Sequence, residues 1–159
     1  MSGPEVVWYG DDSESLIHRV VPFIASAVQD HGAALVIASA EHERAFRAAL
    51  EELGVDIHSA AMRDRLVFLN ANEVIKGLFV DGEIDRARYV RLVVNPIRKL
   101  GERYTVHAYG EVAGILGSMG RLDAVARLQG LARELLRDVP VRLVAGYPAH
   151  AFEQELNSA

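Results

Sequence analysis

Five short apolar runs, separated by longer segments of helical periodicity, constrain the fold of this chain more than any other feature. The runs cover residues 6–9, 33–38, 66–69, 105–109 and 142–147. Strands that are separated throughout by helices need crossover connections, and these produce a parallel sheet with helices on both faces. The sequence therefore predicts an α/β fold, a three-layer sandwich with a five-stranded, mainly parallel sheet.

Helix-start and helix-stop residues divide the chain in the same way. Candidate N-caps precede the helical segments at Asp11, Ser39, Asn70 and Asp123, and a further helix is expected to begin at Asp85. The first and third of these are followed three residues later by glutamate, which is the spacing of a capping box. We expect the helix after Asn70 to run to Val80 and to break at Asp81-Gly82, and the helix from Asp85 to end at Gly101.

Length and composition indicate one globular domain without a targeting signal. The chain has 159 residues, and we expect a single unit over 1–159 with its core at about 5–153. No stretch approaches the roughly 20 apolar residues of a membrane span, and the N-terminus lacks the pattern of a secretory signal. The sequence therefore predicts a cytoplasmic domain that does not contact a membrane.

Charge and cysteine content narrow the range of partners. The formal net charge of -5 gives no general attraction to nucleic acid or to anionic lipid. The sequence contains no cysteine, which excludes disulfides, thiol nucleophiles and cysteine-ligated metals. We expect a small molecule or another protein as the partner, and we predict no cofactor, no metal and no direct contact with nucleic acid.

The loop after the first run argues against nucleotide hydrolysis. In an open parallel sheet the ligand crevice lies beyond the carboxyl ends of the strands. A phosphate-binding loop at this place needs glycines, a lysine and a hydroxyl group. This chain has Gly10-Asp11-Asp12-Ser13-Glu14-Ser15 instead. The carboxylates of Asp11 and Asp12 would repel a triphosphate.

Two catalytic motifs are incomplete. His42-Glu43 opens a zinc-protease motif, but Phe46 stands where the second histidine is needed. Gly117-Ser118-Met119-Gly120 lacks the first glycine of a nucleophile elbow, because Leu116 stands there, and it closes a helix instead of leaving a strand. We interpret this second segment as a helix stop.

Several segments in register carry a resemblance to a known family. They are residues 105–112, a leucine-rich helix, residues 142–148 with Phe152, a first strand that ends in Tyr9 and acids, Leu69-Asn70-Ala71 before a helix, and the turn at 79–85. Over roughly residues 5 to 153 the chain resembles the MEDS family. This family is the methanogen and methylotroph sensory domain, first associated with a dichloromethane-responsive regulator.

The resemblance implies a RecA- or KaiC-like core without a Walker A motif, in agreement with the acidic first loop. It also implies a sensory domain, of a type often joined to a helix-turn-helix module or a histidine kinase. Gln129 and Arg133 depart from the family's pattern, since an acid and an amide are usual there. We therefore expect either a different ligand or a domain that binds only a partner.

The candidate site lies where the predicted strands end. The residues expected at this edge are Tyr9, Asp11, Asp12, Ser39, His42, Asn70, Asn72, Tyr109, Glu111, Tyr147 and His150. The ligand-binding candidates among them are Tyr9, Asp11, Asp12, Tyr109, Glu111, Tyr147 and His150. Glu111 follows Gly110, whose missing side chain leaves room for a ligand, and a carboxylate beside tyrosines suits a small organic molecule. The alternative is a structural role, because the helix dipole favours an acid at a helix start.

A stripe of arginines is the candidate partner surface. Arg88, Arg91 and Arg98 share roughly one face of the helix after Asp85, and they suit an acidic protein surface better than DNA. A solvated face is the alternative. The expected partner is a histidine kinase, a sigma-factor regulator or a transcription regulator, and self-association is a further option.

The sequence favours a non-catalytic sensory or regulatory domain that binds a small molecule, a signalling protein, or both. One alternative is an enzyme that uses Glu111 or Asp12 as a general base with His150 or His42 nearby. Another is a scaffold without a small ligand. A pocket with a strongly raised carboxylate pKa would favour the enzyme, and a packed or flat carboxyl edge would favour the scaffold.

Overall fold

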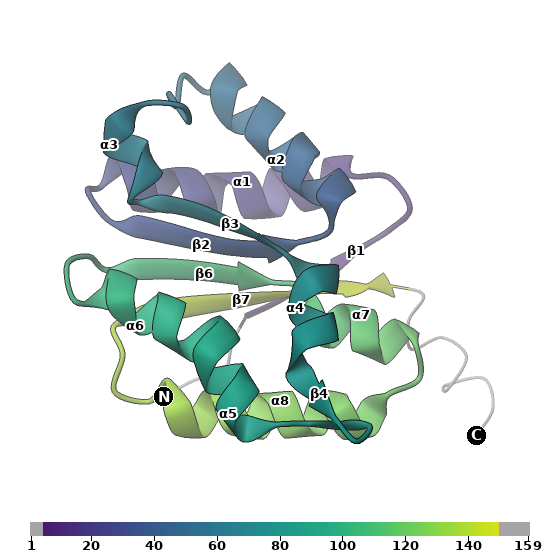
Figure 1. Ribbon diagram of the computed structural model, residues 1–159. Helices are drawn as coiled ribbons and strands as arrows, with labels where there is room; N and C mark the ends of the chain where they lie inside the picture. The colour runs from purple at the N-terminus through teal and green to yellow at the C-terminus, as the bar shows by residue number, and fades with distance from the viewer. Residues whose placement is uncertain (1–4, 150–159) are drawn as a thin grey trace.

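A five-stranded sheet is the framework of the molecule, and the computed structural model describes residues 5–149 (Figure 1). The strands are β1 (Glu5–Tyr9), β2 (Ala33–Ala38), β3 (Leu66–Asn70), β6 (Val106–Gly110) and β7 (Val141–Pro148). They lie in the order β1-β7-β6-β2-β3, and every neighbouring pair is parallel. The predicted α/β fold is confirmed, with a sheet that is parallel throughout.

Helices cover both faces of this sheet and complete the predicted three-layer sandwich (Figure 1). On one face lie α1 (Glu14–Gln29), α2 (Ala40–Glu52) and the short α3 (Ala60–Arg63). On the other lie α4 (Ala71–Leu78), α5 (Arg86–Tyr89), the π-helical segment η1 (Val90–Val94), α6 (Asn95–Gly101), α7 (Val112–Ser118) and α8 (Leu122–Leu135). Between residues 5 and 149, no helix combines the length and the apolar character that crossing a membrane requires.

Strand β2 shows how the sheet divides two cores. All six of its residues are buried, as expected for a continuous apolar run with helices on both faces. Ala34 and Val36 belong to the core under α1 and α2, whereas Leu35 and Ile37 belong to the core under α4 to α8. Alternate side chains of a strand point to opposite faces, so β2 is anchored on both sides. Burial of a valine, leucine or isoleucine contributes about 1.5 to 3 kcal/mol.

Two of the predicted N-caps, Ser39 and Asn70, are confirmed, and Asp85, the predicted helix start, is a cap as well. The side chains of Ser39, Asn70 and Asp85 each accept a hydrogen bond from the backbone N–H three residues later. Caps of this kind typically contribute about 1 kcal/mol each. Helices α2 and α4 therefore begin directly after β2 and β3, at the carboxyl edge of the sheet.

Two predicted caps are wrong. Ser13, and not Asp11, occupies the N-cap position of α1, and no side-chain hydrogen bond caps this helix. Helix α8 has Arg121, and not Asp123, at its N-cap position. The carboxylate of Asp123 pairs with the guanidinium of Arg121 at 3.1 Å, so it is engaged within the first turn of the helix.

The segment after α4 forms a hairpin that the sequence did not predict. The predicted helix end at Val80 is wrong, because β4 (Phe79–Val80) pairs with β5 (Glu83–Ile84) in antiparallel fashion. Asp81 and Gly82 connect the strands with φ values of 52° and 80°. A two-residue type I′ turn needs positive φ at both positions, and Asp-Gly is one of its preferred sequences. The Asp81-Gly82 pair, which the sequence indicated as a helix break, is therefore the turn of this hairpin, and α4 itself ends at Leu78.

The helical stretch predicted from Asp85 to Gly101 is confirmed, with one irregularity. Its middle is π-helical, and the N–H of Asn95 donates to the C=O of Val90. Pro96 follows directly, and because proline has no N–H, the regular helical ladder loses a donor here. The wider turn lies where the ladder is interrupted.

Candidate functional site

The carboxyl ends of β2 and β6 meet at one edge of the sheet. Ile37 is paired with Gly110 in this register. The N–H of Glu111 donates to the C=O of Ile37 at 2.9 Å, which extends the contact between the two strands by one residue. The starts of α2 and α7 are thereby held next to each other, and Ser39 and Glu111 lie at these starts.

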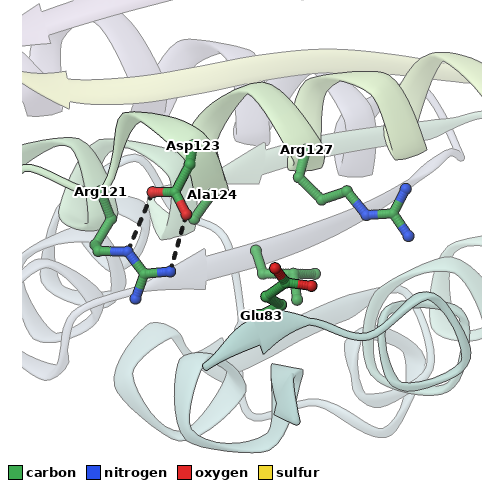
Figure 2. A pocket seen from close by; sticks show the side chains of 6 residues that line it. Glu83, Arg121, Asp123, Ala124 and Arg127 are labelled. Carbon is green, nitrogen blue, oxygen red and sulfur yellow. Dashed lines mark hydrogen bonds and ion pairs between the residues drawn. The ribbon is translucent and has the colours of Figure 1, made fainter. Parts of the chain in front are cut away.

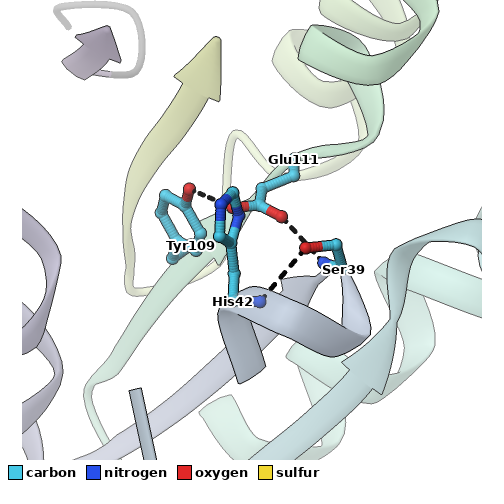
Figure 3. A network of polar contacts seen from close by, with 4 residues as sticks. All are labelled: Ser39, His42, Tyr109 and Glu111. Carbon is cyan, nitrogen blue, oxygen red and sulfur yellow. Dashed lines mark hydrogen bonds and ion pairs between the residues drawn. The ribbon is translucent and has the colours of Figure 1, made fainter. Parts of the chain in front are cut away.

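The carboxylate of Glu111 is completely buried and has three hydrogen-bond partners (Figure 3). Its Oε1 accepts from the backbone N–H of Ser39 at 2.8 Å. Its Oε2 accepts from the hydroxyl of Tyr109 at 2.6 Å and lies 2.6 Å from Nδ1 of His42. A buried carboxylate is costly unless it is both paired and hydrogen-bonded. These three groups, which come from β6 and from the start of α2, satisfy it.

Aromatic rings surround the imidazole of His42. Tyr9 meets it edge-on, with ring centroids 5.0 Å apart, and Phe46 lies 6.2 Å from it. Phe46 in turn meets the ring of Tyr109 edge-on at 5.5 Å. The ion pair is therefore shielded by apolar ring surface from β1, α2 and β6. We use the name Glu111 cluster for Tyr9, Ser39, His42, Tyr109 and Glu111.

Burial and the charge of Glu111 set the protonation states in the Glu111 cluster. Burial disfavours the charged imidazole of His42, but the hydrogen bond to Glu111 and the charges of Glu111 and Glu41 outweigh it and raise the pKa of His42. Burial first, and then the charge of Glu111, raises the pKa of both Tyr9 and Tyr109. At neutral pH both tyrosines are therefore protonated, and His42 holds its second proton more firmly than a free histidine does.

Three glycines determine what fits around the Glu111 cluster. A Cβ on Gly146 of β7 would come within 2.1 Å of the hydroxyl oxygen of Tyr109. Gly10 and Gly110 lie at the carboxyl ends of β1 and β6, and no atom of residues 5–149 stands within 4 Å of the Cβ position of either. The ring of Tyr109 therefore fills the space next to Gly146, whereas the space beside Gly10 and Gly110 is open. This agrees with the room that the sequence led us to expect at Gly110.

The remaining ligand candidates lie in different settings. Asp11 and Asp12 are exposed in the loop between β1 and α1. Tyr147 on β7 is buried, packs against Trp8 with ring centroids 5.5 Å apart, and has the amide of Gln129 at 3.4 Å from its hydroxyl. His150 lies outside the described residues. Gln129, a position that departs from the family pattern, is thus next to a candidate ligand residue.

Two of the three arginines of the predicted partner surface already donate hydrogen bonds to backbone carbonyls of this chain. Arg88 donates to the C=O of Gly77 at 3.3 Å, and Arg98 donates to the C=O of Leu135 at 2.9 Å. Arg91 is exposed and makes no hydrogen bond or ion pair within the described part of the chain. Its guanidinium is therefore the one most available to a partner among these three.

One hollow lies away from the predicted site, between β5 and the first turns of α8 (Figure 2). Its volume is about 270 Å³, and its lining residues are Glu83, Ile84, Arg121, Asp123, Ala124 and Arg127. None of the predicted ligand residues belongs to this lining. The Arg121–Asp123 pair occupies one side of it, as Figure 2 shows.

The Glu111 cluster brings an imidazole and a phenol within hydrogen-bond distance of the same carboxylate oxygen. Among the residues that the structure describes, no three His, Cys, Asp or Glu side chains are grouped so as to hold a metal ion. The sequence predicted Ser39 and His42 at this edge, but it placed His42 near Glu111 only in the enzyme alternative and did not predict the contact with Ser39. These partners are 72 and 69 residues away along the chain, so no local spacing signals the contacts.

A family model matches residues 6–158 of the chain, nearly its whole length. The family is MEDS, described as the methanogen/methylotroph, DcmR sensory domain. No curated protein and no solved structure matches the chain. The relation to RecA- or KaiC-like cores therefore stays a prediction.

Proposed function

The chain belongs to the MEDS family of sensory domains, and we propose that it is a non-catalytic regulatory domain that binds a small organic molecule and relays its presence to a signalling protein. The burial of Glu111 carries the proposal. A general base must reach the proton that it removes, whereas the Glu111 side chain has 0% exposure and three hydrogen-bond partners. This carboxylate suits a role in holding α2 against β6 better than one in proton transfer.

We place the ligand at the open side of the Glu111 cluster, beside Gly10 and Gly110. The absence of side chains at these two positions supports this placement, since neither Cβ position has a neighbour within 4 Å in the described part of the chain. Tyr9 supplies an aromatic edge there, because its ring lies against His42. Pockets for small organic molecules combine apolar ring surface with few polar groups, and this edge offers both.

Helix α2 is the element through which we propose that the signal leaves. A single carboxylate connects two groups at its start, the N–H of Ser39 and the ring of His42, to β6. A ligand that changes either contact biases the position of α2 relative to the sheet. A ligand can shift such an equilibrium only by its differential affinity for the two positions. The partner is a histidine kinase, a sigma-factor regulator or a transcription regulator, with Arg91 as a candidate contact for an acidic surface.

A screen for ligands with a charge-removing variant tests this function. Small organic molecules are first selected by the rise in melting temperature that they give the wild-type domain, and their affinity is then measured by calorimetry. We expect Glu111→Gln to weaken binding by about tenfold or more, equal to about 1.4 kcal/mol. The matched control is Glu73→Gln, because Glu73 is an exposed acid whose carboxylate, within residues 5–149, pairs only with Lys76 at 3.4 Å. Wild-type affinity in Glu111→Gln, or no stabilising molecule at all, would contradict the proposal.

A second candidate function is catalysis, and the 2.6 Å contact between Glu111 and Nδ1 of His42 favours it. A carboxylate that orients an imidazole in this way is the arrangement of a general base. Hydrolysis of p-nitrophenyl acetate distinguishes the two functions. We expect the wild-type rate not to exceed that of Glu111→Gln or His42→Gln. A wild-type rate that falls at least about a hundredfold in both variants would favour the enzyme.

A further inference from the structure

We infer that Nε2–H of His42 is the donor that recognises the ligand, and that the ligand presents a neutral oxygen acceptor, such as a carbonyl or ether oxygen, to this atom. The inference rests on the proposed sensory function and specifies its polar contact. It also assigns Glu111 a positioning role, because the Glu111 side chain has 0% exposure whereas that of His42 has 14%.

The two nitrogens of His42 have different surroundings. Nδ1 lies 2.6 Å from Oε2 of Glu111 (Figure 3). Nε2 makes no hydrogen bond to any atom between residues 5 and 149. Every buried side-chain nitrogen or oxygen in this part of the chain has a hydrogen-bond partner, so a nitrogen without a partner is not buried. Nε2 therefore reaches the molecular surface. It is the one polar atom of His42 that a ligand can contact without breaking the Glu111 pair.

The contact between Nδ1 and Glu111 also determines whether Nε2 donates or accepts a hydrogen bond. A carboxylate accepts, so the proton on Nδ1 points to Glu111. In the protonated ring Nε2 then also carries a hydrogen and can only donate. The raised pKa of His42 keeps this form present to a higher pH than in a free histidine. A ligand with an acceptor atom fits this nitrogen, and a ligand with only donors does not.

The charges around His42 favour a neutral acceptor over an anion. From the β6–α7 side the imidazole meets the carboxylate of Glu111, which balances its charge, and the neutral hydroxyl of Tyr109 lies beside that carboxylate. From β1 it meets the protonated Tyr9, and the charge of Glu41 acts on it from α2. Exposed acids also follow Tyr9 at positions 11 and 12. The remaining charge at this edge is therefore negative, and it repels an anionic ligand.

Three probes that share one ring and differ in their polar group test the inference. They are cyclohexanone, a neutral acceptor, cyclohexanecarboxylate, an anionic acceptor, and cyclohexylammonium, a donor. Each is titrated into the full chain labelled with nitrogen-15 in histidine side chains, at about pH 6, where histidine is mainly protonated. We expect cyclohexanone to shift the Nε2 resonance of His42 and to bind at least about tenfold more tightly than the other two.

Two substitutions of His42 separate its nitrogens. The amide nitrogen of His42→Gln can occupy the position of Nε2, whereas that of His42→Asn can occupy the position of Nδ1. We expect His42→Gln to keep measurable binding of cyclohexanone and His42→Asn to lose it, with melting curves confirming that both variants are folded. Tighter binding of cyclohexylammonium, or unchanged affinity in His42→Asn, would overturn the inference.

Failure of this contact is distinguishable from failure of the sensory function. Cyclohexanone that shifts the amides of Gly10 and Gly110 but leaves Nε2 of His42 unmoved would overturn the assignment of His42 and leave the sensory function intact. If none of the three probes shifts a resonance at this edge, the acceptor specificity is wrong. The library screen with Glu111→Gln then decides the sensory function independently.

Discussion

At the scale of single residues, Glu111 and His42 depend on each other for their charge. The imidazole lies 2.6 Å from the carboxylate, and its pKa is raised by this contact against the effect of burial. We predict that Glu111→Gln lowers the pKa of His42, whereas Glu73→Gln leaves it unchanged. A nitrogen-15 NMR titration of the histidine side chains measures both. An unchanged pKa in Glu111→Gln would mean that the pair does not form in solution.

The sign of the pKa shift fixes the pH dependence of stability. The folded-state pKa of His42 is raised above its unfolded value of about 6.5, so the stabilisation is fully present below this pH and is lost as the pH rises through the folded pKa. We predict that the wild type loses stability relative to His42→Gln across this window. Urea unfolding at about pH 6 and about pH 9 measures the difference. A constant difference would contradict the raised pKa.

Gly146 is needed because the ring of Tyr109 lies against it. A Cβ at this position would come within 2.1 Å of the hydroxyl oxygen and about 3 Å of two ring carbons. We predict that Gly146→Ala costs about 1 to 3 kcal/mol of unfolding free energy, as overpacked cores do. Combining it with Tyr109→Phe removes the closest atom and should recover part of the loss. Full wild-type stability of Gly146→Ala in urea unfolding would show that Tyr109 does not occupy this place.

At the scale of secondary-structure elements, helix α8 contains a glycine that, unlike Gly146, has room for a side chain. Gly130 lies within this helix, and among the residues that the structure describes none stands within 4 Å of its Cβ position. Glycine in a helix interior costs about 0.5 to 1 kcal/mol relative to alanine. We predict that Gly130→Ala raises the free energy of unfolding by this amount, which thermal or urea unfolding measures. A loss of stability would indicate an unseen close neighbour of α8.

The same scale shows what the sequence could and could not predict. The five strands were predictable because each is a short apolar run between segments of helical periodicity, most clearly β2, which is buried on both faces, and Ser39 and Asn70 were identifiable as caps from type and position. The hairpin at Asp81-Gly82 carried a signal that a helix interpretation missed. The pairing of Glu111 with Ser39 and His42 could not be predicted, because it depends on the register of β2 against β6.

At the scale of the whole molecule, the acidic loop after β1 determines which ligands are excluded. Asp11 and Asp12 are exposed there, and the chain carries a net charge of -5. We predict that calorimetry with magnesium and ATP gives no binding tighter than about 1 mM. The control is the same titration with Asp11→Asn and Asp12→Asn combined, which removes the repulsion. Micromolar affinity of the wild-type chain for ATP would contradict the interpretation of this loop.

The central claim is that the carboxyl edge around the Glu111 cluster binds a small molecule without converting it. Two-dimensional NMR spectra of the nitrogen-15-labelled domain, recorded with and without the tightest molecule from the ligand screen, test this claim directly. We predict shifts at Gly10, Ser39 and Gly110 that extend along α2, with the added molecule recovered unchanged. Shifts confined to the hollow between β5 and α8, or chemical conversion of the molecule, would contradict the claim.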